Sequence, residues 1–120
     1  KRGSVLIACP PLETHGLPAA MCAELVRSRG FSPINLGADT PVDTIVKAAL
    51  STNELVAIVL STVSSTSEKT LIEVVKAVHG SLPTTPVMIG GVWPDLPDNV
   101  VSINGFPSML NQLELLGESQ

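Results

Sequence analysis

The feature that most constrains the fold is a run of six apolar residues, LVAIVL, at Leu55–Leu60. A short run rich in β-branched residues is typical of a strand covered on both faces, because a strand with one face in water alternates apolar and polar side chains. Such strands occur mainly in parallel sheets that carry helices on both sides. The composition agrees, since 44% of the residues are hydrophobic and only 15% are charged. We therefore expect 55–60 to be the central strand of an α/β sheet.

Shorter strand and helix patterns alternate on either side of this run. Apolar, β-branched segments predict strands at 4–9, 31–36, 86–89 and 100–103. Apolar residues at helical spacing predict helices at 17–29, 42–50, 71–78 and 106–116. Gly30 stands where a helix C-terminal glycine belongs, and Gly80 is expected to close the third helix. Residues 37–41 supply a turn, a capping side chain and a proline for the start of the second.

Five strands alternating with helices predict a doubly wound parallel sheet, because right-handed crossovers place helices on both faces. We expect a flavodoxin-like, Rossmann-like strand order of 2-1-3-4-5 in a single domain spanning 1–120. In such sheets ligands bind beyond the carboxyl ends of the strands, near the point where the strand order reverses. The loops of interest are therefore 10–17, 61–66, 90–94 and 104–107.

Charge and cysteine content exclude several classes of function. The formal net charge is −4 and the seven Lys and Arg residues are scattered, so we expect no direct contact of this segment with nucleic acid. No apolar run approaches the ~20 residues of a membrane span, and no secretory leader is present, which favours a cytoplasmic location without membrane contact. Cys9 and Cys22 lack zinc-type spacing and are expected to be buried thiols in a reducing compartment.

Polar and glycine residues gather on three of the selected loops. Glu13-Thr14-His15-Gly16 follows the first strand, Ser61-Thr62-Val63 the third, and Gly90-Gly91 the fourth. A neutral imidazole is a good ligand for a transition metal, and its other ring nitrogen needs an acceptor, a role that suits Glu13. Ser61, with Ser65 or Thr66, can hydrogen-bond an inserted ligand, and glycines allow its close approach to the backbone.

Each of these residues also has a simpler interpretation. His15 is then a solvated loop histidine, and Glu13 a surface carboxylate or a partner of the following helix N-terminus. Ser61 merely ends its strand, and the two glycines form a tight turn. Trp93 either packs against the ligand region or covers an apolar edge.

The three segments together resemble the cobalamin-binding domain of methionine synthase, cobalamin-dependent mutases and light-responsive MerR-type regulators. The motif of that family reads Asp-x-His-x-x-Gly, then Ser-x-Leu, then Gly-Gly. Here 42 residues separate Pro18 from Ser61 and 26 separate Val63 from Gly90, which fits the family spacing. The sequence departs from the motif in having Glu13 for Asp, Pro18 for Gly and Val63 for Leu. Glu-x-His is the form associated with the MerR-type regulators, and 8–13 and 36–41 are also similar to that branch.

The resemblance implies a corrinoid ligand, adenosylcobalamin or methylcobalamin, with its cobalt held from below by His15. It also implies that the loop at 104–108 contacts the nucleotide tail. The implied cofactor-binding residues are Glu13, Thr14, His15, Gly16, Leu17, Ser61, Val63, Ser65, Gly90, Gly91 and Gly105.

Two main functions are compatible with this resemblance. The form of the motif favours a sensory, photoreceptor-type module of a transcriptional regulator, with no catalytic residue and with the DNA-binding domain elsewhere in the parent chain. The alternative is a corrinoid-carrying module of a cobalamin-dependent methyltransferase or mutase. A related sensor that takes haem, or no cofactor, is a further alternative, and the oligomeric state, including a homo-oligomer, is left open.

Overall fold

The computed structural model describes residues 2–62, 68–90 and 96–118. Within them every expected strand and helix is present, in the expected order. The strands are β1 (Ser4–Ala8), β2 (Ser32–Asn35), β3 (Leu55–Leu60), β4 (Val87–Gly90) and β5 (Val100–Ile103). The helices are α1 (Leu17–Ser28), α2 (Val42–Ser51), α3 (Glu68–Ser81) and α4 (Gly105–Glu118).

The strands form one parallel sheet of order β2-β1-β3-β4-β5, which confirms the predicted topology. Strand β3 lies at the centre, between β1 and β4, and its residues 56–60 are buried. Ile7 of β1 pairs with Val59 of β3. The order reverses at β1 and β3, so the loops that leave the carboxyl ends of these two strands lie at the point where ligands of such sheets bind.

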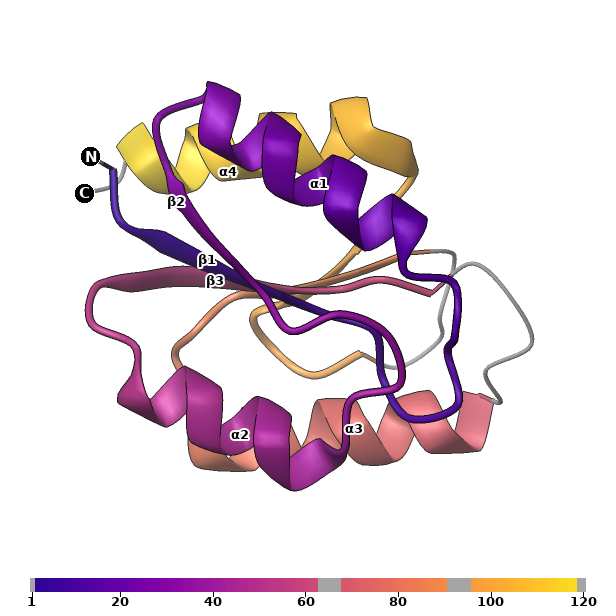
Figure 1. The fold of residues 1–120 in the computed structure, drawn as a ribbon. Coiled ribbons are helices and arrows are strands. Elements are labelled where there is room, and N and C mark those ends of the chain that lie inside the picture. Colours follow the sequence, from indigo (N-terminus) through magenta and orange to yellow (C-terminus); the bar gives the residue numbers. More distant parts are fainter. Residues whose placement is uncertain (1, 63–67, 91–95, 119–120) are drawn as a thin grey trace.

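Two helices cover each face of the sheet, with α1 and α4 on one side and α2 and α3 on the other (Figure 1). Successive side chains of β1 divide between two cores: Val5 and Ile7 pack with α1 and α4, whereas Leu6 and Ala8 pack with α2 and α3. This division explains the uninterrupted apolar sequence of the central strands, because both faces of the pleat are buried. In the described parts of the chain, no helix is long and apolar enough to cross a membrane.

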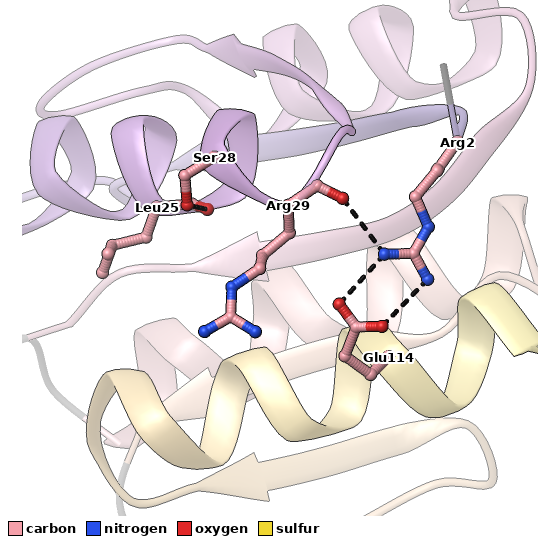
Figure 2. A network of polar contacts seen from close by, with 5 residues as sticks. All are labelled: Arg2, Leu25, Ser28, Arg29 and Glu114. Carbon is pink, nitrogen blue, oxygen red and sulfur yellow. Dashed lines mark hydrogen bonds and ion pairs between the residues drawn. The ribbon is translucent and has the colours of Figure 1, made fainter.

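Arg2 ties three elements together at the amino end of β1 (Figure 2). Its Nη1 and Nη2 donate to the two carboxylate oxygens of Glu114 in α4, at 2.9 and 3.0 Å. Nη1 also donates to the carbonyl of Arg29, just beyond α1, at 3.0 Å. The guanidinium lies 4.5 Å from the ring centroid of Phe31, in cation–π contact. These contacts therefore lie at the end of the sheet opposite the loops that follow the carboxyl ends of the strands.

Two local expectations about helix ends were wrong. Gly80 does not close α3, which continues to Ser81, and the amide of Leu82 still donates to the carbonyl of Val78 at 2.8 Å. The residue before α2 is Pro41, which is its N-cap rather than its first helical residue, and no side chain caps this helix. The capping candidates bond elsewhere, because the Thr40 hydroxyl donates to the carbonyl of Gly37 at 3.1 Å and the Asp39 carboxylate accepts from the amide of Leu12.

Candidate functional site

A sharp turn after β1 directs Glu13 into the protein. The amide of Glu13 donates to the carbonyl of Pro10 at 3.0 Å, which leaves Pro11 and Leu12 at the centre of the turn. Proline suits the first central position because its φ is fixed near the required value. Leu12 occupies the second with a φ of 74°, in the left-handed region that glycine usually fills. The turn thus places a carboxylate with no exposed surface directly beneath the next loop residues.

Glu13 and His15 form the pair that the sequence suggested. Glu13 Oε2 lies 3.1 Å from Nδ1 of His15 and accepts a hydrogen bond from the His15 amide at 3.4 Å. The Glu13 side chain is 0% exposed, whereas that of His15 is 61% exposed. A carboxylate can only accept, so this contact favours the tautomer with its proton on Nδ1, which leaves the lone pair on Nε2. The arrangement presents Nε2 as the ring nitrogen available to a metal.

Cys9 lies beneath the same loop, and sequence reasoning assigned it no role beyond packing. Its Sγ donates to the carbonyl of His15 at 3.7 Å, and it shares a side-chain hydrogen bond with Ser61. The pKa of the thiol is raised, first by burial and then by the negative charge of Glu13, against the opposing effect of the Ser61 hydrogen bond. Cys9 is therefore a neutral donor between the loop after β1 and the end of β3.

The loop between β2 and α2 supports residues 9–16, which follow β1 and which we call the histidine loop. The supporting loop was not among the loops that the sequence suggested. The amide of Cys9 donates to the carbonyl of Gly37 at 3.0 Å, and the amide of Thr40 donates to the carbonyl of Cys9 at 2.9 Å. Asp39 adds two further bonds to Leu12 and Glu13. The strand order was the signal that pointed to this loop, because β2 is the neighbour of β1 and their carboxyl ends meet at one edge.

The other described candidate residues lie on the loop after β1, at the start of α1, and at the ends of β4 and β5. Gly16 is the N-cap of α1 and lies against Ala38, since a Cβ on Gly16 would be 3.7 Å from that of Ala38. Thr14 and Leu17 are exposed, and Leu17 is 71% exposed at the first position of α1. A Cβ on Gly90 would meet the carbonyl oxygen of Thr62 at 3.6 Å, so the ends of β3 and β4 are close.

Gly105 begins α4, beyond β5, with a φ of 82°. The remaining candidates, Val63, Ser65, Thr66, Gly91 and Trp93, lie outside the described residues.

The donor set fits a macrocyclic metal cofactor better than a free metal ion. No group of three or more His, Cys, Asp or Glu side chains that would hold a bare ion occurs in 2–62, 68–90 or 96–118. A cofactor whose metal is already held in a macrocycle would need only one nitrogen from the protein. His15, whose side chain is 61% exposed and whose Nδ1 contacts a buried carboxylate, has the chemistry of such a donor.

The chain matches one known protein family in sequence and several solved structures in fold. The family model described as "B12 binding domain" matches residues 3–99. No curated protein sequence matches the chain. A cobalamin-binding protein from Desulfitobacterium hafniense DCB-2, solved as a crystal structure, superposes with a TM-score of 0.79 at 22% identity, covering 97% of this chain.

The methanol:cobalamin methyltransferase complex from Methanosarcina barkeri contains a similar chain, with a TM-score of 0.80 at 15% identity over 99% of this chain. At these identities the likeness concerns the fold. This chain spans 60% of the first matched chain and 48% of the second.

Proposed function

This chain belongs to the B12 binding domain family, and we propose that it is the corrinoid-carrying module of a methyltransferase, with His15 as the lower axial ligand of cobalt. The observation that carries the proposal is the contact of 3.1 Å between Glu13 Oε2 and His15 Nδ1, together with the exposure of the imidazole. A ligating histidine is usually oriented by an acceptor on its second nitrogen. Glu13 is such an acceptor, fixed in place by its burial.

In this proposal each part of the site has a separate task. Cobalt, when the corrinoid is bound, supplies a centre that can receive and release a methyl group. His15 would hold the cobalt, Glu13 keeps the proton on Nδ1 of His15, and the Cys9 thiol donates to the carbonyl of His15 from inside the protein. We expect Ser61, which follows β3, and Gly90, at the end of the neighbouring β4, to contact the nucleotide tail. The substrate site belongs to another domain or subunit.

The likeness to a methyltransferase complex supports a carrier over the sensory module that the Glu-x-His motif favoured. Neither transcription regulation nor light sensing is supported by the comparisons. The two functions differ in what binding does to the protein. In a sensor, binding changes the assembly or the posture of an attached domain, whereas the task of a carrier is to present its cofactor to a substrate site. Size-exclusion chromatography with and without methylcobalamin separates them, and a change in oligomeric state on binding or illumination would favour the sensor.

The role of His15 is tested by the absorption spectrum of the purified chain with methylcobalamin. Binding to the wild type is expected to give the spectrum of a nitrogen-ligated corrin. His15→Ala is expected to bind more weakly and to give the spectrum of a corrin without a lower nitrogen ligand. Glu24→Gln is the matched control, because Glu24 is an exposed residue of α1 to which no role in cofactor binding is assigned. An unchanged spectrum in His15→Ala would show that another group occupies the lower position.

A further inference from the structure

The loop between β2 and α2 makes a two-way contact with the turn that precedes His15. The amide of Leu12 donates to Oδ1 of Asp39 at 2.8 Å, and the amide of Asp39 donates to the carbonyl of Glu13 at 2.7 Å. Asp39 thus accepts one hydrogen bond from the turn and donates another to it. We propose that Asp39 is a positioning residue for His15, a role that rests on the proposed function of His15 as the cobalt ligand.

Backbone conformation shows why the turn needs this support. Leu12 has a φ of 74° and Asp39 a φ of 47°, both in the left-handed region. Aspartate adopts that region more readily than other residues with a side chain, whereas a leucine there is strained and persists only where its surroundings hold it. Leu12 is 71% exposed, so its side chain contributes little packing to hold it. Besides the hydrogen bond from the Glu13 amide to the Pro10 carbonyl that closes the turn, the bond from the Leu12 amide to Asp39 holds this conformation.

The constraint passes from the turn to the imidazole through Glu13. Asp39 holds the Glu13 carbonyl, the Pro10 carbonyl holds the Glu13 amide, and the Glu13 carboxylate holds His15 at two atoms. A rotation of the turn would therefore move the carboxylate and release the ring. Further along the loop, Gly16 packs against Ala38, so the same supporting loop touches both ends of the histidine segment.

Helix capping does not account for Asp39. The N-cap of α2 is Pro41, and no side chain caps the helix. The Asp39 carboxylate is directed instead to a residue 27 positions earlier in the sequence. Asp39 lies just before α2, where a capping residue could stand, but its hydrogen bonds are made to the histidine loop.

Two substitutions separate the side chain of Asp39 from its backbone conformation. Asp39→Gly removes the acceptor and adopts a positive φ without strain, so it is expected to fold. Asp39→Asn keeps both an acceptor oxygen and tolerance of this conformation. Asp43→Ala, which removes an exposed carboxylate in the first turn of α2, is the matched control.

The test measures methylcobalamin binding, its absorption spectrum, and amide hydrogen exchange of Leu12 in the cofactor-free chain. Loss of one hydrogen bond that orders the loop is expected to weaken binding by Asp39→Gly about three- to tenfold, with a larger fraction of corrin lacking the histidine. Leu12 exchange is expected to be faster in the same variant. Asp39→Asn and Asp43→Ala are expected to remain within about twofold of the wild type, since each keeps the Leu12 hydrogen bond.

Two negative results have different meanings. If His15→Ala changes the spectrum but Asp39→Gly binds like the wild type with the same spectrum, Asp39 has no positioning role and the proposed function stands. If His15→Ala leaves the spectrum unchanged, the proposed function and the role of Asp39 fail together. A lower melting temperature in Asp39→Gly without a spectral change would assign Asp39 to stability alone and overturn the proposal.

Discussion

Substitution of Glu13 tests how much of the binding energy depends on orienting His15. The Glu13 carboxylate is buried and contacts His15 at 3.1 and 3.4 Å, so its removal acts directly on the proposed cobalt ligand. Loss of such a supporting group typically weakens metal affinity about 10- to 100-fold, or about 1.4 to 2.7 kcal/mol. Glu13→Gln preserves the shape and one acceptor oxygen but loses the charge, which supplies about half of the strength of such a bond. We therefore expect about tenfold weaker binding.

Glu13→Ala removes the acceptor altogether and leaves a cavity in the core, so its effect is expected near the upper limit of about 100-fold. Its melting temperature is also expected to fall, because buried volume is lost. Affinity is measured by titrating methylcobalamin into the purified chain and following the absorption spectrum. Glu24→Gln, on an exposed position of α1, is the control.

Two results would refute this reasoning. Glu13→Gln with the affinity of the wild type would show that the contact does not orient the histidine. If Glu13→Gln instead had the same effect as His15→Ala while remaining folded, Glu13 would contact the cofactor directly.

Two further predictions concern charges and thiols outside the histidine pair. The hydrogen bond from Arg2 lowers the pKa of Glu114, so this pair stabilises the fold above the usual pKa of a glutamate and loses that effect as the pH falls through the lowered value. Glu114→Gln is therefore expected to melt at a lower temperature than the wild type at about pH 7, and the difference is expected to close as the pH falls below the usual pKa of a glutamate. A difference independent of pH would contradict this. Burial raises the pKa of Cys22 to about 12 and also raises the pKa of Cys9. Iodoacetamide at about pH 8 is therefore expected to modify neither thiol until the chain is unfolded. Rapid modification of the folded chain, detected by mass spectrometry, would contradict this prediction.

The fold followed from sequence because its signals are local and repeated. The run at 55–60 required two covered faces, and the alternation of strands with helices then restricted the topology to a few arrangements. Errors occurred at the ends of two helices, for different reasons. Gly80 stays helical because the hydrogen-bond ladder continues past it, and Asp39 does not cap α2 because Leu12 competes for its carboxylate.

The candidate site was predictable only where its members are neighbours in sequence. Glu13 and His15 are two residues apart, so their pairing follows from the motif and the geometry of one loop. The contacts of Asp39 and Cys9 cross between elements and join backbone groups as often as side chains. Backbone donors and acceptors are the same for nearly every residue type, so the sequence carries little record of such bonds.

The Arg2–Glu114 pair joins the beginning of β1 to the last part of α4, at the end of the strands opposite the loop that carries His15 (Figures 1 and 2). A chemical linker attached near Arg2 or Glu114 would lie at the end of the sheet where β1 begins. A protein immobilised on a sensor surface through such a linker would turn its histidine loop towards the solution.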